Sequence, residues 1–344
     1  MNNTAAQSKN NKETDKKMKT PTSPRINSKE VFKELDDKLE LLAERLDSPE
    51  TENEIKEFLK FQSKFHSYSF YNQFILHQQA NARNTRLEKV GSFDFWKKQK
   101  NDKGEKVSVK KGSKGFKVFV PIKYTKYETD NKGCFILDTN NKRIPMLDEK
   151  GNIIKGLTFN LGNVFDVNQT TAKKIGAYKE LEYRNKNLEI SDSVYYELKS
   201  NIEKSFNIKI TEELMSNSAL GGYCDYIGKS IVINSNPERT TAMKISTLFH
   251  EIGHSIMHSE LVLNGDVETK ELERGLREGQ AEAFSFAVSS YFGIENKSEL
   301  YIKTWGNSGK ELKNSIQTVS KAIKKAFETL KLDKISFEIE QKVA

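Results

Sequence analysis

Apolar residues recur every three or four positions over several stretches of the chain, which is the spacing of one face of a helix. The first stretch starts at Ser28, and a second opens at TENE, where Thr51 and Glu54 form a capping box. Further helices are predicted in SFYNQFILHQQA, SDSVYYELKSNI, RTTAMKISTLFHEIGHSIMHSE, RGLREGQAEAFSFAVSSYFG and KNSIQTVSKAIKKAFETLK. Gly293 is expected as the residue that ends the fourth of these.

Strands are predicted where apolar residues alternate with polar ones. The stretch KVSVKKGSKGFKVFVPI predicts a β-hairpin with its turn at KKGSKG, and DYIGKSIVINSN predicts a strand with Ile231 and Ile233 on one side. A short helical turn is expected around Trp96. Residues 127–165 carry several turn signals and indicate further hairpins or a loose insertion.

These elements together predict an α+β fold with two domains, and 344 residues are ample for two cores. Residues 28–166 would form a basic domain of helices and a β-hairpin, and residues 167–344 a mostly helical domain. Residues 1–27 contain almost no large apolar side chain, so we expect them to be a disordered tail.

Composition excludes several classes of protein. No run of about 18 apolar residues is present, so a membrane-spanning helix is not expected. The first residues lack the apolar stretch of a secretory signal. The two cysteines, Cys134 and Cys224, are too few for a disulfide framework, so we expect a cytoplasmic protein.

Positive charge is concentrated in one part of the chain. The net charge of the whole protein is +8, whereas residues 56–123 hold sixteen Lys or Arg against five acidic residues, a net +11. Charge segregated in this way favours a polyanionic partner.

Aromatic residues are interleaved with these cations, a combination found in proteins that bind single-stranded nucleic acid. Phe58, Phe65 and Phe74 fit a hydrophobic core better, whereas Tyr71 and Trp96 fit a core or a base-stacking role equally well. The candidate DNA-binding residues from this pattern are Tyr71, Trp96, Lys97, Lys98, Lys110, Lys111, Lys114 and Lys117.

The sequence HEIGH predicts a metal site on a helix. His250 and His254 are four residues apart, so their rings leave the same side of the helix and could share one ion. Glu251 would then act as general base on a water that the metal activates, as in metallopeptidases. Zinc is the expected ion, and another divalent metal would also suit.

A third ligand is predicted on the next helix, in REGQAEAF. We assign Glu278 as the ligand and Glu282 as the partner that orients a ligand imidazole, although the reverse assignment stays open. His258 lies a further turn along and is expected to support the site without binding the ion. Tyr223 and Tyr226 could pack at the start of a strand or offer a hydroxyl to an oxyanion.

Both halves of the chain resemble ArdC-type antirestriction proteins. SYSFYNQFILHQQA carries a Ser-x-x-Asn-Gln element at Ser69, Asn72 and Gln73, and it precedes a Gly-x-x-x-x-Trp element and a Lys-Gly-x-Lys-Gly element. LFHEIGHSIMH with REGQAEAFSFAVSSYFGI is similar to the zincin-like domain of these proteins, which is related to the ImmA/IrrE group. The resemblance covers roughly residues 55–125 and 210–295.

The resemblance implies a domain that binds single-stranded DNA, with Asn72 among its contacts, joined to a metal-binding domain. Proteins of this family are carried by mobile elements and protect incoming DNA from restriction. Two alternatives stay open: a regulatory metallopeptidase that cleaves a repressor or host protein, and a DNA-binding protein with a purely structural metal. The oligomeric state is not predicted by any feature of the sequence.

Overall fold

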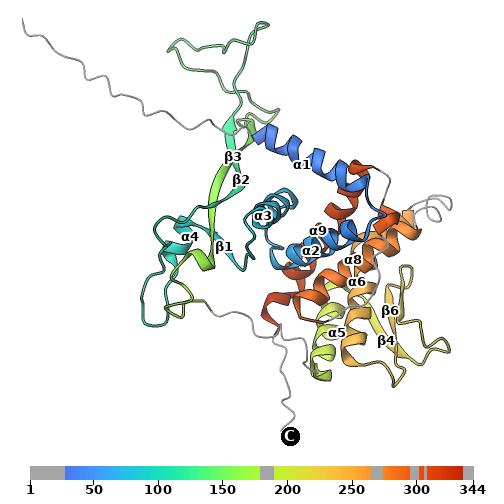
Figure 1. Ribbon diagram of the computed structural model, residues 1–344. Coiled ribbons are helices and arrows are strands. Elements are labelled where there is room, and N and C mark those ends of the chain that lie inside the picture. The colour runs from blue at the N-terminus through green and yellow to red at the C-terminus, as the bar shows by residue number, and fades with distance from the viewer. Residues whose placement is uncertain (1–27, 179–189, 265–273, 295–301, 306–307, 336–344) are drawn as a thin grey trace, which may run out of the picture.

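The computed structural model describes residues 28–178, 190–264, 274–294, 302–305 and 308–335, and the predicted tail at residues 1–27 lies outside them. Helices dominate, and two small sheets lie at different places against them (Figure 1). The predicted α+β fold class is confirmed.

The N-terminal half consists of three helices followed by a sheet. Its elements are α1 (Ser28–Ala43), α2 (Pro49–Lys64), α3 (Phe70–Ala82), β1 (Val90–Ser92), α4 (Phe93–Lys98), β2 (Phe116–Thr125), β3 (Lys155–Asp166) and the 3₁₀ turn η1 (Val167–Gln169). The sheet is antiparallel, with β3 between β1 and β2.

The C-terminal half places a second sheet beside long helices. Its elements are α5 (Asp192–Phe206), β4 (Lys209–Glu213), β5 (Gly222–Asp225), β6 (Ser230–Asn234), α6 (Thr241–Asn264), α8 (Arg274–Tyr291), η3 (Ile302–Trp305), α9 (Gly309–Leu330) and η4 (Leu332–Lys334). Strand β6 is central, parallel to β4 and antiparallel to β5.

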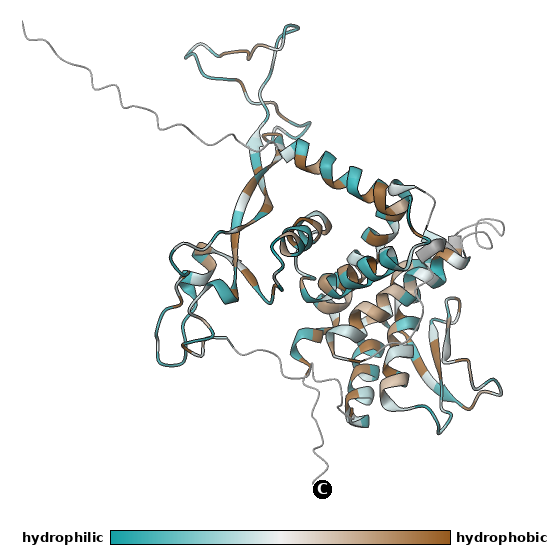
Figure 2. Ribbon diagram, viewed as in Figure 1, coloured by the Kyte–Doolittle hydropathy of each residue, from teal (hydrophilic) through white to brown (hydrophobic). Residues whose placement is uncertain are grey.

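One hydrophobic core joins the helices of both halves. It includes Leu39 of α1, Leu59 of α2, Ile252 of α6 and Ile323 of α9, each less than 2% exposed. The apolar positions of these helices face one another, and the polar positions face outward (Figure 2). The core therefore crosses the domain boundary predicted at residue 166, and that division stays a prediction.

The pairing of β2 corrects the predicted hairpin. Residues 116–125 pair with residues 155–164 of β3, so the two strands are joined by residues 126–154 and not by KKGSKG. Val107 does not pair with β2. Its side chain packs with buried Trp96 and is itself 2% exposed. Alternation along the sequence showed where β2 lies but could not identify its distant partner.

The start of α2 also differs from the prediction. The helix begins at Pro49, and the side chain of Ser48 accepts a hydrogen bond from the Thr51 backbone N–H. Ser48 is therefore the N-cap, and the proline at the first helical position fixes a helical φ. Gly293 follows α8 with φ +75°, as predicted for the residue after a helix end.

Helices α6 and α8 pack closely because α6 has a glycine at their contact. A Cβ atom added at Gly253 would lie 2.8 Å from Cδ1 of Phe284, a fully buried residue of α8. One turn before the two histidines, the Ser285 hydroxyl donates a hydrogen bond of 2.8 Å to the Ser246 carbonyl oxygen. Backbone and side chains of the two helices thus meet directly.

Replacement of this glycine should destabilise the protein. We expect Gly253→Ala to lower the free energy of unfolding by about 1–3 kcal/mol, because the added methyl group overpacks the contact with Phe284. Gly275→Ala on α8 is the matched control, since its nearest neighbour, Thr304 Cγ2, would lie at an ordinary 3.4 Å. Urea unfolding of both variants tests this, and equal midpoints would contradict it.

Candidate metal centre

The orientation of α6 is determined by its apolar positions. Ile245, Leu248, Phe249 and Ile252 are each fully buried in the shared core. Burial of this face turns the neighbouring face, which carries the histidines, toward α8 and a cleft. The helical spacing in the sequence therefore selects which residues can form a site.

Three side chains bring donor atoms together at this face. The Nε2 atoms of His250 and His254 are 3.1 Å apart. Oε2 of Glu278 lies 3.4 Å from Nε2 of His250 and 3.3 Å from Nε2 of His254. Among the described residues these three form a group of potential metal ligands.

The spacing of these donors suits a small divalent cation. Ligands that bind zinc at about 2.0–2.1 Å in a tetrahedron are about 3.3 Å from one another. The three distances, 3.1, 3.3 and 3.4 Å, are close to this value. Two imidazoles and a carboxylate are also a donor set that zinc and similar metals bind.

Glu282 supports one of the two imidazoles. Its Oε2 atom lies 3.1 Å from Nδ1 of His250, on the opposite side of the ring from Glu278. A carboxylate in this place holds the ring with Nε2 directed at the ion. The geometry supports Glu278 as ligand and Glu282 as orienting partner, and the assignment stays a prediction.

A chain of hydrogen bonds supports the other imidazole. Nδ1 of His254 is 3.2 Å from Nδ1 of His258, whose Nε2 is 3.0 Å from Oε1 of Gln280. The Gln280 amide donates to the Ser315 hydroxyl, which donates to the backbone carbonyl of Trp305. The chain therefore leads from α6 through α8 to α9.

The last acceptor of this chain, the Trp305 carbonyl, determines the direction of each hydrogen bond before it. The Trp305 carbonyl can only accept, so Ser315 donates to it and accepts from the Gln280 amide nitrogen. Oε1 of Gln280 then accepts from Nε2–H of His258. Neutral His258 accepts at Nδ1 from Nδ1–H of His254, which leaves Nε2 of His254 without a proton and able to bind a metal.

Electrostatics favour the ionised form of the carboxylate ligand. A hydrogen bond from His250, together with the neighbouring ring of His254, lowers the pKa of Glu278 well below its usual value. Burial alone would lower the pKa of His250, but its hydrogen bonds to Glu278 and Glu282 outweigh burial and raise that pKa to about 10. Burial lowers the pKa of His258 to about 4, which keeps this ring neutral.

Glu251 lies beside the three donors, and its carboxylate is shielded from solvent. Its side chain is buried, and burial raises its pKa to about 7, against the lowering effect of His250. A carboxylate with a pKa near neutrality is well suited to take up and release a proton. Cys224, on β5 nearby, remains a thiol because burial and the charge of Glu251 raise its pKa to about 12.

The donors open into a cleft of about 560 Å³ between β5, α6 and α8. Tyr223 and Tyr226 both line it, so the choice between a packing role and a catalytic one stays open for them. Tyr223 is 46% exposed, whereas Tyr226 is half-buried, and burial raises the pKa of its hydroxyl.

Trp96 does not match its predicted role in DNA binding. Its ring is only 2% exposed, and Nε1 donates a hydrogen bond of 2.8 Å to the Phe165 carbonyl. Both the ring and its polar atom are therefore used inside the fold, so a base cannot stack on it. A tryptophan among lysines has the same sequence pattern in both situations.

Tyr71 and Asn72 also have internal partners. The Tyr71 hydroxyl donates to Asp36, and its ring packs against Phe32. The amide of Asn72 donates to the Phe119 carbonyl and accepts from the Phe119 N–H, so it links α3 to β2. These contacts give both half-buried residues a role in the fold, and their predicted contact with DNA stays a prediction.

The lysines predicted to bind DNA are more accessible. Lys117 is half-buried, and the others are exposed: Lys97, Lys98, Lys110, Lys111 and Lys114. Lys110 donates to the Asn168 carbonyl, which holds its stem against η1. Their accessibility is compatible with DNA binding, but exposed lysines are also common on surfaces that bind no DNA.

Two members of the metal-centre chain were not predicted from the sequence. Gln280 lies between the two acidic residues of REGQAE, and Ser315 lies on a distant helix. Gln280 is two positions from both Glu278 and Glu282, so helical spacing alone would have placed it on a different face of the helix. No local signal marks Ser315.

Comparisons with known proteins agree with this arrangement of a helical N-terminal half and a zincin-like C-terminal half. Residues 26–158 match the family model of the N-terminal domain of anti-restriction factor ArdC. Residues 203–302 match that of the IrrE N-terminal-like domain, which contains the candidate metal centre. The chain therefore combines an N-terminal domain of the ArdC type with an IrrE-like domain, which supports the resemblance to ArdC-type proteins.

Two solved structures are similar to the chain, both of the antirestriction protein ArdC from plasmid R388. The metal-free structure is 17% identical over 77% of this chain and 83% of that chain, with a TM-score of 0.44. The Mn(II)-bound structure is 18% identical over 79% and 86%, with a TM-score of 0.42. No curated protein matches the chain.

The described helices include none that is both long and apolar enough to cross a membrane.

Interruption of the chain of hydrogen bonds should weaken metal binding. We expect Gln280→Leu to reduce affinity for Zn²⁺ by about 10–100-fold, because His258 would no longer fix the tautomer of His254. Glu251→Gln is the matched control, since Glu251 is buried beside the donors but lies outside this chain of hydrogen bonds. Calorimetric titration of both variants is the measurement, and equal affinities would contradict the role of the chain.

Proposed function

We propose that this protein protects the DNA of a mobile element from restriction by binding its single strands, and that it hydrolyses a peptide bond at a zinc site. Zinc would be held by His250, His254 and Glu278. The observation that carries the enzymatic part is the convergence of these three donors beside buried Glu251.

The form of the donor set favours catalysis over a structural metal. Structural zinc sites use four protein ligands, whereas catalytic sites use three and leave a position for water or substrate. Among the residues that the structure describes, three donors converge here, and they line a cleft of about 560 Å³. A peptide could therefore approach the ion from the cleft.

The protein residues would divide the work of hydrolysis between them. Zinc, when bound, would polarise the peptide carbonyl and the attacking water. The Glu251 carboxylate would accept the proton of that water and pass it to the amine nitrogen as the peptide bond breaks. Glu282 and the His258–Gln280 pair would hold the two ligand imidazoles in place throughout.

The DNA-binding part is supported by charge and by family. Residues 56–123 carry a net +11, and they lie within the segment that matches the N-terminal domain of anti-restriction factor ArdC. Cations of this density attract phosphate chains and release counterions when they bind. A regulatory metallopeptidase that cleaves a repressor or host protein is the second candidate, and it would use the same centre.

The peptidase reaction should depend on Glu251. We expect Glu251→Gln to reduce the rate of peptide cleavage at least about 100-fold, because the amide cannot accept the proton, while zinc content stays at one ion per chain. Cleavage of a peptide library by the zinc-loaded protein is the measurement. Undiminished cleavage in this variant, or none in the unaltered protein, would contradict the enzymatic proposal.

Binding to single-stranded DNA should fall steeply with salt. If four phosphates are contacted, the affinity for an oligonucleotide should fall about 50-fold between roughly 50 and 200 mM salt, from the counterion term for single strands. Fluorescence anisotropy with a labelled oligonucleotide measures this, and a duplex of the same sequence serves for comparison. A salt-independent affinity would argue against the DNA-binding proposal.

A further inference from the structure

Two cavities lie where the N-terminal helices meet α8, away from the metal centre. The first, of about 640 Å³, is bounded by α2, α3, the segment after α3 and the end of α8. The second, of about 810 Å³, is bounded by the residues after α2, by β1 and by Tyr178. Lys64 and Tyr291 line both, so the cavities are neighbours, and we refer to them together as the junction cavities.

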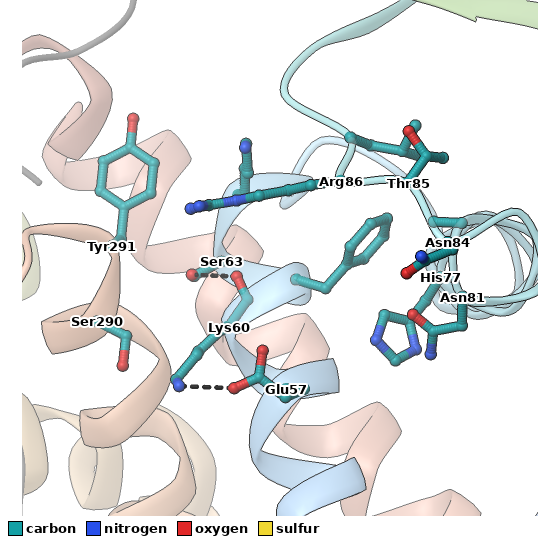
Figure 3. Close-up of a pocket in the computed structure, with 14 residues that line it drawn as sticks. Glu57, Lys60, Ser63, His77, Asn81, Asn84, Thr85, Arg86, Ser290 and Tyr291 are labelled. Carbon is teal, nitrogen blue, oxygen red and sulfur yellow. Dashed lines mark hydrogen bonds and ion pairs between the residues drawn. The ribbon is translucent and has the colours of Figure 1, made fainter.

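The first cavity combines a cation with amide groups. Arg86 extends from the segment after α3 toward Tyr291 of α8, while His77 and Asn81 stand on the other wall (Figure 3). Asn81 and Asn84 are both exposed, and their amides can donate and accept hydrogen bonds. The volume lies within the roughly 300–1,000 Å³ of small-ligand sites and is ample for one nucleobase.

The second cavity combines a cation with ring faces. The Lys89 ammonium lies 5.7 Å from the centre of the Phe95 ring and 5.8 Å from that of Tyr178. Both rings are half-buried and line the cavity. Rings on which bases can stack, next to cations that follow phosphates, are the two parts of a single-strand binding site.

Three acidic residues line the junction cavities, and two of them have partners of their own, while Asp333 lines the second cavity beside His66. Glu57 pairs with Lys60 at 2.7 Å, and Glu88 pairs with Lys173 at 2.6 Å. Within the described part of the chain, neither Arg86 nor Lys89 forms an ion pair. Their positive charges are therefore available to a ligand.

We propose that the junction cavities bind single-stranded DNA, with one nucleobase in the first cavity and phosphates on Arg86 and Lys89. This inference rests on the proposed DNA-binding function and names its site. It differs from the site that the sequence favours, because the exposed lysines of the KKGSKG turn line neither of the junction cavities.

The salt dependence of binding tests the phosphate contacts. Loss of one contact should reduce the slope of log affinity against log salt by about 0.7, and the affinity at roughly 50 mM salt about eightfold. We expect this of Arg86→Gln and of Lys89→Gln, with twice the change in slope for the double variant. Lys209→Gln, an exposed lysine of β4 outside both cavities, removes the same charge and should leave the slope unchanged.

A test of the base contact needs a variant that leaves the charge of the protein unchanged. Ser290→Phe places a ring at the α8 wall of the first cavity and should weaken DNA binding several-fold without a change in the salt slope. Thermal unfolding of each variant shows whether it is folded. A photo-crosslinkable oligonucleotide on the unaltered protein provides a result that does not depend on variants, because its crosslinks should map to residues 57–64, 81–95 or 290–291.

The outcomes separate this inference from the function on which it rests. If the unaltered protein binds single strands but Arg86→Gln and Lys89→Gln keep its slope, the site is wrong and the function stands. Crosslinks confined to residues 110–117, with a slope reduced only in Lys111→Gln and Lys114→Gln, would lead to the same conclusion. If the unaltered protein does not bind single strands, both proposals fail.

Discussion

The close packing of α6 against α8 is the constraint on which the metal centre depends. Two donors come from one helix and the third from the other, so the distance between the helices determines whether the three can share an ion. Gly253 permits this distance, because any larger residue would meet Phe284. A functional site needs its side chains within about 0.5 Å of the working geometry, and a close contact between two helices is rigid enough to provide that.

The metal centre and the N-terminal half are also connected, because both contact helix α9. On one side the helix holds the centre through Ser315. On the other, Phe327 stacks on His66, and Ser320 donates a hydrogen bond to buried Gln73. The Ser-x-x-Asn-Gln element, which the resemblance connects with DNA, thus includes two residues that join parts of the fold: Asn72 binds β2 and Gln73 binds α9.

The sequence predicted the helices well because they depend on local spacing, and the same spacing is the basis of the predicted metal centre, whose ligands stay a prediction. His250 and His254 lie on one face of α6 for the same geometric reason that the apolar residues of α6 lie on another. Local spacing does not show which strands pair when they are far apart in the sequence. The predicted partner of β2 was therefore wrong, and β4 and β5 were not predicted. Side-chain burial was equally inaccessible, since an aromatic ring beside lysines can stack on a base or, like Trp96, fill a small core.

The central claim is that one divalent cation binds between α6 and α8, and a crystal structure of the zinc-loaded protein tests it most directly. Anomalous scattering at the zinc edge should show one ion about 2.0–2.2 Å from Nε2 of His250, Nε2 of His254 and a carboxylate oxygen of Glu278. An ion bound through Glu282 instead would reverse the ligand assignment. An ion bound elsewhere, or none at saturating zinc, would contradict the account.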